Sequence, residues 1–511
     1  MDTGFQKEAI AFLSDPASYG RHVATVDVIE THISVVFLAG DRAYKLKRAV
    51  KFPYLDFSTP AQRRRACDAE LMLSRRTAPD LYLEVRGVAR HADGRLGWAV
   101  DGETAGEWVV VMQRFDQEQL LDCLAREGRL GTTLILELIA HIVDFHAQAE
   151  ARPDAGGAAA MAAIEVENDV CLQHFGEGFF ASEHVAELHT SSQKQISSIA
   201  DLLNARRAAG EVRRCHGDLH LSNICVYEGK PVLFDCLEFS EEFGTIDILY
   251  DLAFLLMDLE YRGLPDLANL AANRYLDLSD EDDGLAALPL FLSLRAAIRA
   301  HVTAAAAHRD AGPGLSESKA EARRYLELAR QCLALQPNRL IAIGGVSGTG
   351  KSTLAHRLAP LLGIRPGAHV LRSDVIRKRL WGVEPETPLP PGAYETEITQ
   401  RVYDTIRQKA AVTLRAGYCV IVDAVALGEN DRRSFAKLGA DVGVPFRGIW
   451  LHASARMLAD RLRARRNDAS DATVTVLDQQ LRCDPGPIDW LQIEALDRET
   501  TFGSVRQALG V

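Results

Sequence analysis

The sequence predicts two dissimilar domains, a mixed α+β domain followed by an α/β domain with a parallel sheet. Strand-like segments are concentrated in residues 22–115, and mostly helical segments follow to about His308. After residue 337, strands and helices alternate, which is typical of a parallel sheet with helices on both faces. No internal repeat is visible, so the two parts are different domains and not a duplication.

The composition is that of a soluble globular protein. Of 511 residues, 47% are hydrophobic and 25% are charged, and the net charge is -12. This balance argues against nucleic acid or an anionic membrane surface as the main partner. The start lacks a signal-peptide pattern, and no run of about 18 apolar residues predicts a membrane span. The nine cysteines lack metal-binding spacing, so we expect reduced, buried thiols and a cytoplasmic location.

The first domain is expected to cover residues 1–336. Its first lobe, about 22–115, contains predicted strands and one helix, and its second lobe, about 116–310, is mainly helical. The predicted strands are His32–Ala39, Ala43–Lys47, Leu81–Val88, Trp108–Met112, Ile224–Tyr227 and Pro231–Asp235, and the first-lobe helix is Pro60–Arg76. Helices are expected to resume at Ile246.

A linker helix is expected at about 314–336, from a helical pattern over Lys319–Leu335 that ends at Gln336-Pro337-Asn338. The second domain is therefore expected at residues 337–511. Its predicted strands are Leu340–Gly344, His369–Arg372, Tyr418–Val422 and Phe446–Leu451, and its predicted helices are Lys351–Leu362, Ala393–Arg415, Asp431–Leu438 and Ala453–Leu462.

The sharpest motif is G-x-x-x-x-G-K-S at Gly345–Ser352, between an apolar strand and a predicted helix. Glycines let several backbone N–H groups point at one anion, and the helix start adds a positive dipole end. Lys351 is predicted to reach the nucleotide phosphates as a catalytic residue, and the Ser352 hydroxyl to ligate Mg²⁺. The predicted nucleotide-binding residues are Gly345, Val346, Ser347, Gly348, Thr349, Gly350, Lys351, Ser352 and Thr353. ATP and Mg²⁺ are the cofactors expected.

Further polar residues follow the strands of this domain, where open α/β sheets bind ligands. Asp374 is the candidate for accepting the proton of an acceptor hydroxyl, with a helix N-cap as the alternative. Arg377 is the candidate for holding an anionic group of the substrate. Asp423 ends an apolar strand and is predicted either to hold Mg²⁺ through water or to cap the next turn.

An arginine cluster surrounds the helix Ala453–Leu462. Its members are Arg456, Arg461, Arg463, Arg465 and Arg466. Arginines there could close over the transferred phosphoryl group, and the alternative is a solvated helix face. Arg461 and Arg465 are the predicted catalytic members. With the phosphate-binding loop and the Ser-Asp-x-x-Arg segment, residues 338–511 resemble P-loop kinases of the gluconate-kinase, polynucleotide-kinase and zeta-toxin type.

A second phosphotransfer motif, H-G-D-x-x-x-x-N, lies at His216–Asn223, and a strand ending at Asp235 follows. Kinases use an Asp to orient the substrate hydroxyl, an Asn five residues on for Mg²⁺, and a second metal-binding Asp. Residues 25–310 resemble the aminoglycoside phosphotransferase and choline-kinase branch of the protein-kinase-like fold. The resemblance implies Asp218 as catalytic base, and Asn223 and Asp235 as Mg²⁺ ligands.

The same resemblance implies further positions around this motif. His216 would be structural, His220 would face the site or pack, and Asp247 and Asp251 would fix the loop. Gly217 stands where protein kinases have Arg.

The first lobe should supply a lysine and a glutamate to the same site. Lys45 is favoured and Lys47 is the alternative, both on one face of a strand, and Glu70 is the expected partner. A surface ion pair is the structural alternative. Met112 and Gln113 are expected to contact adenine. The segment Glu30–Ser34 contains no glycine, so the nucleotide cover of this site is undefined.

The whole chain resembles bacterial bifunctional proteins with an aminoglycoside phosphotransferase domain and an ATP-binding domain. This implies an enzyme with two kinase sites that acts on hydroxyl groups of small metabolites, such as sugars. Two alternatives stay open: one domain is an ATP-binding regulator, or the P-loop half is a polynucleotide 5′-hydroxyl kinase.

Overall fold

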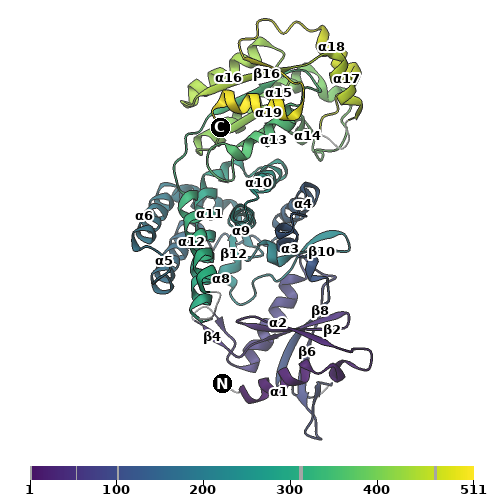
Figure 1. The fold of residues 1–511 in the computed structure, drawn as a ribbon, viewed down its shortest axis with the longest axis vertical. Helices are drawn as coiled ribbons and strands as arrows, with labels where there is room; N and C mark the ends of the chain where they lie inside the picture. Colours follow the sequence, from purple (N-terminus) through teal and green to yellow (C-terminus); the bar gives the residue numbers. More distant parts are fainter. Residues whose placement is uncertain (1–2, 53–54, 101–102, 310–314, 465–468) are drawn as a thin grey trace. The chain divides into compact units, whose positions relative to one another are not determined.

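The computed structural model describes residues 3–52, 55–100, 103–309, 315–464 and 469–511 (Figure 1). Contacts divide the chain into two compact units, residues 1–157 with 205–255, and residues 158–204 with 256–511. The second unit therefore includes helices that the sequence analysis assigned to the first domain. The two units are defined by contacts and not by a domain boundary along the chain. The boundary expected near residue 337 therefore stays a prediction.

A six-stranded antiparallel sheet forms the first lobe, in the order β1-β2-β3-β8-β6-β7. Its strands are β1 Val26–Glu30, β2 Ser34–Ala39, β3 Arg42–Lys47, β6 Tyr82–Arg90, β7 Leu96–Trp98 and β8 Glu107–Gln113. Val109 belongs to a buried cluster with residues of α1 (Thr3–Ser14), and Val110 to one with Cys67 of α2 (Pro60–Ser74). The alternation of side chains along the strands thus gives each helix its own face of the sheet.

The same alternation places the two lysines of β3. Tyr44 and Leu46 pack in the cluster on the α1 face. Lys45 and Lys47 therefore project toward α2. That helix begins with a capping box, in which Thr59 accepts from the Gln62 backbone and Gln62 bonds back to Thr59.

The second lobe is built of helices and two short antiparallel pairs of strands. In these pairs β9 joins β12 and β10 joins β11. The first unit's remaining elements are η1 Pro16–Tyr19, β4 Lys51–Phe52, β5 Leu55–Asp56, η2 Gln117–Gln119, α3 Leu121–Arg126, α4 Thr132–Gln148, β9 Val212–Arg214, η3 Leu221–Asn223, β10 Ile224–Tyr227, β11 Lys230–Leu233, α8 Glu241–Gly244 and β12 Thr245–Asp247. Helices α7 Ala200–Ala209 and α9 Ile248–Tyr261 run across the division between the units.

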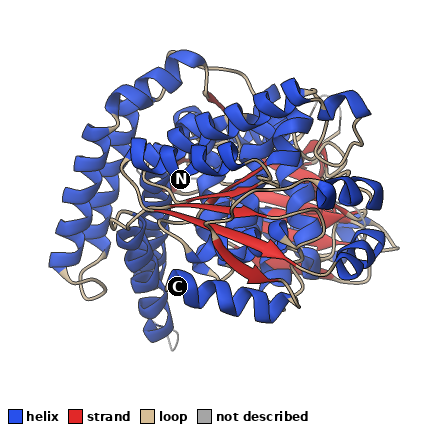
Figure 2. Cartoon of the chain, turned by 90° about the horizontal axis from the view of Figure 1, so that it is seen from above, coloured by secondary structure: helices blue, strands red, loops and turns tan. Residues whose placement is uncertain are grey.

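The second unit contains a five-stranded parallel sheet in the order β14-β15-β13-β16-β17. The strands are β13 Leu340–Gly344, β14 His369–Arg372, β15 Val420–Asp423, β16 Phe446–His452 and β17 Leu491–Glu494. One core holds Leu340 and Ala342, and the other holds Ile341 and Ile343, so both faces of β13 are buried. Figure 2 shows blue helices on both sides of red strands.

The helices of this sheet are α13 Lys351–Leu358, η5 Ala359–Leu361, α14 Ser373–Leu380, η6 Pro391–Tyr394, α15 Thr396–Arg415, α16 Glu429–Val442, α17 Ala455–Ala464, α18 Val474–Arg482 and α19 Arg498–Leu509. The unit's other helices are α5 Gly157–Phe175, α6 Ser182–Ser198, α10 Pro265–Ser279, η4 Glu281–Ala287, α11 Leu288–Arg309 and α12 Leu315–Cys332. The predicted fold class, an α+β kinase-like domain followed by a parallel α/β domain, is confirmed.

Most predicted element boundaries differ from the structure by one or more residues, and three differences concern the linker helix, Ile246 and Asp374. Helix α12 is Leu315–Cys332, whereas the sequence pattern predicted a helix over Lys319–Leu335. Ile246 lies in β12 instead of a helix, because Thr245–Asp247 pairs with β9. Helix α14 starts at Ser373 with Arg372 as its N-cap, so Asp374 lies in the first turn and does not cap the helix.

The continuous helical stretch Glu281–His308 is apolar and long enough to cross a membrane by length and composition. Of its most apolar window, 72% is buried against other parts of the protein, which is typical of a core helix. All nine cysteines are unpaired; Cys67, Cys215, Cys225, Cys236, Cys332 and Cys419 are buried.

Candidate active sites

A cluster of buried charges joins β3, α2 and the segment after β11 in the first unit. Lys45 Nζ lies 3.0 Å from a Glu70 oxygen and 2.5 Å from Asp235 Oδ1. Burial by itself lowers the pKa of Lys45, but Asp235 and Glu70 raise it above the usual value. Of the two lysines weighed from the sequence, Lys45 is the one that bridges the helix glutamate Glu70 and Asp235, the aspartate predicted to bind metal.

Lys47 extends this cluster with a partner that the sequence analysis missed. Its ammonium group contacts both Glu70 and Glu238, and all three side chains are at most 5% exposed. Burial opposes charge on Glu70, yet the two lysines hold its pKa down at about 2. Glu238 follows Asp235 by three residues, and this spacing was the only sequence signal for it.

The His-Gly-Asp segment forms a loop between β9 and η3. Asn223 Nδ2 donates to the Asp218 backbone oxygen at 2.9 Å and to its Oδ2 at 2.8 Å, which leaves Asn223 Oδ1 for a metal. Asp235 has a left-handed backbone, φ 61°, and its N–H donates to Tyr82 Oη. Oxygen donors of this kind are the ligands that Mg²⁺ prefers, so these residues fit the expected metal.

Asp251 anchors this loop from behind. Its carboxylate accepts the backbone N–H groups of His216 and Gly217 at 3.0 and 2.9 Å. Gly217 has φ 85°, and a Cβ there would lie 3.0 Å from Leu237 Cβ, so the position requires glycine. His220 Nε2 lies 3.4 Å from Asp218 Oδ2, while its ring packs on Phe254. Asp247 accepts from the Arg206 guanidinium and the Leu249 N–H.

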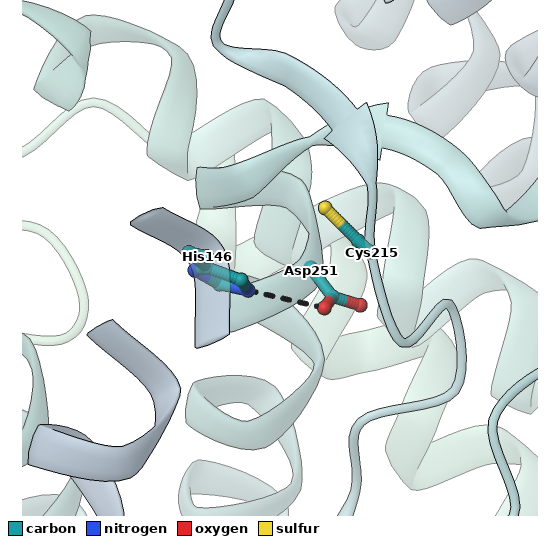
Figure 3. Close-up of side chains that lie close together, drawn as sticks. All are labelled: His146, Cys215 and Asp251. Atoms are coloured by element: carbon teal, nitrogen blue, oxygen red, sulfur yellow. Dashed lines mark hydrogen bonds and ion pairs between the residues drawn. The ribbon is translucent and has the colours of Figure 1, made fainter. Parts of the chain in front are cut away.

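His146, Cys215 and Asp251 lie together behind the loop (Figure 3). His146 Nε2 is 3.2 Å from Asp251 Oδ2, and Cys215 Sγ contacts the Ile246 carbonyl. Although the ligand atoms lie within 4.8 Å of one another, both Asp251 oxygens already accept backbone N–H groups. The cluster therefore holds the His-Gly-Asp loop in place.

The predicted adenine-contacting residues lie at the end of β8. Met112 pairs with Ala43 and Gln113 with Arg42, so both stand on the strand beside Lys45. Both are half-buried. Their contact with adenine stays a prediction.

In the second unit, the phosphate-binding loop connects β13 to α13. Gly345, Gly348 and Gly350 have φ of 129°, 86° and 88°. A Cβ at Gly345 would collide with the Leu451 carbonyl oxygen, so only glycine fits. Lys351 Nζ lies 2.8 Å from the Gly345 carbonyl oxygen. The loop lines a cavity of about 970 Å³ that also reaches Thr353 and α14.

The Ser352 hydroxyl donates to Asp423 Oδ2 at 2.6 Å. Arg372 Nε lies 3.7 Å from the same oxygen. The two residues predicted as metal ligands are thus brought together at the carboxyl ends of β13 and β15. A hydroxyl beside a carboxylate is an oxygen donor set that fits Mg²⁺.

Asp374 and Arg377 line the same cavity. Burial raises the pKa of the Asp374 carboxyl, and a hydrogen bond with Ser470, together with Arg372 and Lys351, only partly offsets this. The Arg377 guanidinium donates to the Ala393 carbonyl and Thr399 Oγ1, and lies 4.8 Å from the centre of the Tyr394 ring.

Two arginines, Arg461 and Arg465, were predicted to close over the transferred phosphoryl group. Arg461 lines the cavity, but its guanidinium donates to the carbonyls of Ala495 and Leu496 at 2.8 and 2.7 Å, and more weakly to Gly348. These contacts anchor α17. Arg465 lies outside the described residues. The catalytic role of both arginines stays a prediction.

Two residues of the cavity, Asp471 and Gln480, were not predicted from the sequence. Asp471 accepts hydrogen bonds from Lys378 Nζ, the Leu389 N–H and Tyr394 Oη, so it holds together the segments that contain these three residues. Gln480 contacts the phosphate-binding loop. Neither belongs to a motif with a fixed spacing, so the sequence offered no signal for them.

Comparison with known proteins agrees with these two sites. The family model described as "Phosphotransferase enzyme family" matches residues 40–290, and the one described as "AAA domain" matches residues 340–484. Uncharacterized proteins of Mycobacterium tuberculosis and Mycobacterium bovis are 33% identical over 459 residues, 88% of this chain and 88% of theirs. The chain belongs to the same family as these mycobacterial proteins. The two matched domains make it a phosphotransferase enzyme with two kinase-type domains.

Two solved structures resemble separate parts of the phosphotransferase. A choline/ethanolamine kinase family protein from Mesorhizobium loti is 13% identical, with 64% of this chain and 99% of that chain covered, at TM-score 0.37. A gluconokinase from Sinorhizobium meliloti is 21% identical, with 35% of this chain and 94% of that chain covered, at TM-score 0.26.

Proposed function

We propose that both domains are active kinases that transfer the γ-phosphoryl group of ATP, with Mg²⁺, to hydroxyl groups of small metabolites in the cytoplasm. The observation that carries the proposal is that each site is complete. In the first site, Lys45 forms an ion pair with Asp235, and Asn223 donates a hydrogen bond to Asp218. In the second, Lys351, Ser352, Asp374 and Asp423 line one cavity.

At the first site, Asp218 accepts the proton of the acceptor hydroxyl as its oxygen forms a bond to the γ-phosphorus. The bond from phosphorus to the bridging oxygen breaks, and ADP leaves with the electron pair. Lys45 holds the nucleotide phosphates, and Glu70 orients Lys45. Asn223 and Asp235 would hold Mg²⁺, which when bound would supply charge neutralisation.

At the second site, the backbone of the phosphate-binding loop and Lys351 hold the phosphates. Asp374 takes the proton of the acceptor hydroxyl. Its raised pKa suits a base, because the carboxylate is a stronger proton acceptor than a solvated aspartate. Ser352 and Asp423 would hold Mg²⁺, which when bound would neutralise negative charge on the nucleotide.

The acceptor of the second site carries a negative charge in this proposal. Arg377 is 6% exposed, and its Nε has no hydrogen-bond partner among the described residues. Asp374 favours its charged form, but no carboxylate of the described residues lies within ion-pair distance of the guanidinium. A buried cation is stable when an anion pairs with it. A sugar acid or sugar phosphate would place its hydroxyl near Asp374 and its anionic group near Arg377.

Two other functions are weaker on specific grounds. If one domain were only a nucleotide-binding regulator, a complete set of phosphotransfer residues in both domains would be unnecessary. A polynucleotide 5′-hydroxyl kinase would need a basic groove. Lys378 and Arg379 are instead occupied by Asp471 and Asp280, and the chain carries a net charge of -12. We expect neither nucleic acid nor a membrane as a partner.

The test is phosphorylation of a panel of neutral and acidic hydroxylated metabolites by the full chain with ATP and Mg²⁺. Asp218→Asn is expected to lower turnover of one acceptor class by about 10²- to 10⁴-fold, and Lys351→Ala to abolish phosphorylation of another. Turnover that survives Lys351→Ala for every acceptor, with nucleotide binding lost, would make the P-loop domain a regulator.

A further inference from the structure

Helix α18 is seated directly on the phosphate-binding loop. Its Leu477 is 1% exposed and packs with Leu458 and Leu462 of α17 in a small cluster separate from the two sheet cores. Val346 of the loop belongs to the same cluster. The next turn of α18 therefore lies beside the loop at a position fixed by packing.

Gln480 is the residue of α18 that touches the loop. Its Oε1 accepts the backbone N–H of Ser347 at 2.8 Å. The side chain is half-buried and lines the cavity together with Lys351, Asp374 and the rest of the loop. The backbone contact thus fixes the oxygen end of the amide at the edge of the nucleotide pocket.

The other end of the amide carries two N–H donors. Among the described residues, Nε2 of Gln480 donates to no protein acceptor. An amide anchored by its oxygen presents these donors without reorganising, which is how neutral side chains stabilise charge that develops in a reaction. The ligand expected beside Lys351 is the phosphate chain of a nucleotide, so a phosphate oxygen is the acceptor that fits.

We propose that Gln480 is a further catalytic residue of the P-loop site, whose amide N–H groups donate to the γ-phosphoryl group during transfer. The inference rests on the proposed function of this site. As the acceptor oxygen bonds to phosphorus and the bridging oxygen departs with ADP, Gln480 holds an equatorial oxygen of the phosphoryl group. The Ser347 N–H is the positioning group for Gln480.

The experiment compares binding of Mg²⁺·ADP and of Mg²⁺·ADP with tetrafluoroaluminate, which mimics the transferring phosphoryl group. The full chain carries Asp218→Asn and Lys45→Met, so that the first site is silenced. Calorimetry then gives both affinities for the parent, Gln480→Ala and Gln480→Leu. Thr475→Ala is the matched control, because Thr475 is exposed on the same helix and does not line the cavity.

We expect Gln480→Ala and Gln480→Leu to leave ADP affinity within about threefold and to weaken the fluoride complex by about 10- to 100-fold. Equal weakening of both ligands would make Gln480 only a support for the loop and overturn the proposal. No change for either ligand, or a parent protein without preference for the fluoride complex, would overturn it as well.

Failure of the proposed function itself looks different. In that case the parent binds no ADP, or binds it no better than a Lys351→Ala variant does. A thermal melt of each variant separates loss of binding from loss of folding. Slow Mg²⁺-dependent ATP hydrolysis by the same proteins gives a second readout, in which kcat falls and KM for ATP is held if Gln480 acts in the transition state.

Discussion

Two lysines of one strand share the glutamate of α2 but differ in their other partner. Lys45 reaches Asp235, which is expected to bind metal, whereas Lys47 reaches Glu238, which is 5% exposed in its side chain. The sequence placed both lysines on one face of the strand, but it held no information on which carboxylates fold back onto that face. We therefore expect the two residues to have separable roles, Lys45 in phosphate binding and Lys47 in stability.

Replacing each lysine by methionine tests this separation. Lys45→Met is expected to lower turnover at the first site by about 100-fold or more, because the phosphates lose their cation. Lys47→Met is expected to lower the free energy of unfolding by about 3–5 kcal/mol, because Glu238 stays buried without a partner. Urea unfolding and ATP turnover of the full chain measure the two effects.

A Lys51→Met variant is the control for stability, because the pair of Lys51 with Asp56 is 64% and 31% exposed. Loss of this exposed ion pair is expected to leave the free energy of unfolding nearly unchanged, because solvent screens the two charges. Adding Glu238→Gln to Lys47→Met should restore part of the lost stability. A double variant as unstable as the single one would mean that packing, not charge, sets the effect.

At the scale of elements, α10 completes the edge of the parallel sheet within the second unit. Strand β14 is an edge strand, and its outer backbone groups are met by two buried asparagines of α10. Asn273 accepts the Val370 N–H at 2.7 Å and donates to the Ala368 carbonyl, while Asn269 donates to the carbonyls of Pro366 and Ala368. Covering an edge in this way satisfies backbone groups that burial would otherwise leave unpaired.

Asn273→Ala is expected to show that strand β14 depends on α10 for a hydrogen-bond partner. The Val370 N–H loses its acceptor, so its amide hydrogen should exchange about tenfold or more faster, and unfolding of the second unit should require about 1–3 kcal/mol less. Hydrogen exchange measured by mass spectrometry over 369–372 reports the first effect. Asn430→Ala, at an exposed position of α16, is the matched control and should match the parent; unchanged exchange in Asn273→Ala would refute the role of α10.

For the molecule as a whole, one buried histidine links stability to pH. His369 is 4% exposed, with Thr413 Oγ1 at 3.1 Å, Asp282 at 3.7 Å, and Lys409 contributing repulsion. Burial lowers the pKa of His369 to about 4, although Asp282 opposes this. The folded protein therefore prefers the neutral ring, and the stability this provides is complete above about pH 6.5 and is lost as the pH falls toward about 4.

Urea unfolding at about pH 7.5 and about pH 5 tests this linkage. Between these two pH values, the free energy of unfolding of the second unit should fall by about 2 kcal/mol more in the wild type than in His369→Gln. The glutamine side chain cannot titrate. Equal losses in the two proteins would show that His369 does not couple folding to protons. Carboxylates titrate in both proteins, so the difference between the two losses of stability isolates the contribution of His369.

The sequence by itself determined both fold classes and the two motif-borne sites. Strand-turn-helix patterns and the spacing within G-x-x-x-x-G-K-S and H-G-D-x-x-x-x-N are local, because neighbouring residues set the backbone that the chemistry needs. For the same reason the segment from β13 to α13, Leu340–Gly344 and Lys351 onward, agrees closely with its prediction. Asp374 and Asp423 could be placed at strand ends by the same logic.

Only the tertiary structure decided which residues meet across long separations of chain. The pairing of Lys47 with Glu238, the contact of Gln480 with Ser347 and the cover of β14 by Asn273 each join residues about 100 or more positions apart. Such contacts depend on how elements pack and not on local propensity, so a single sequence carries no periodic signal for them. The motifs therefore predicted the chemistry, while packing selected the side chains that support it.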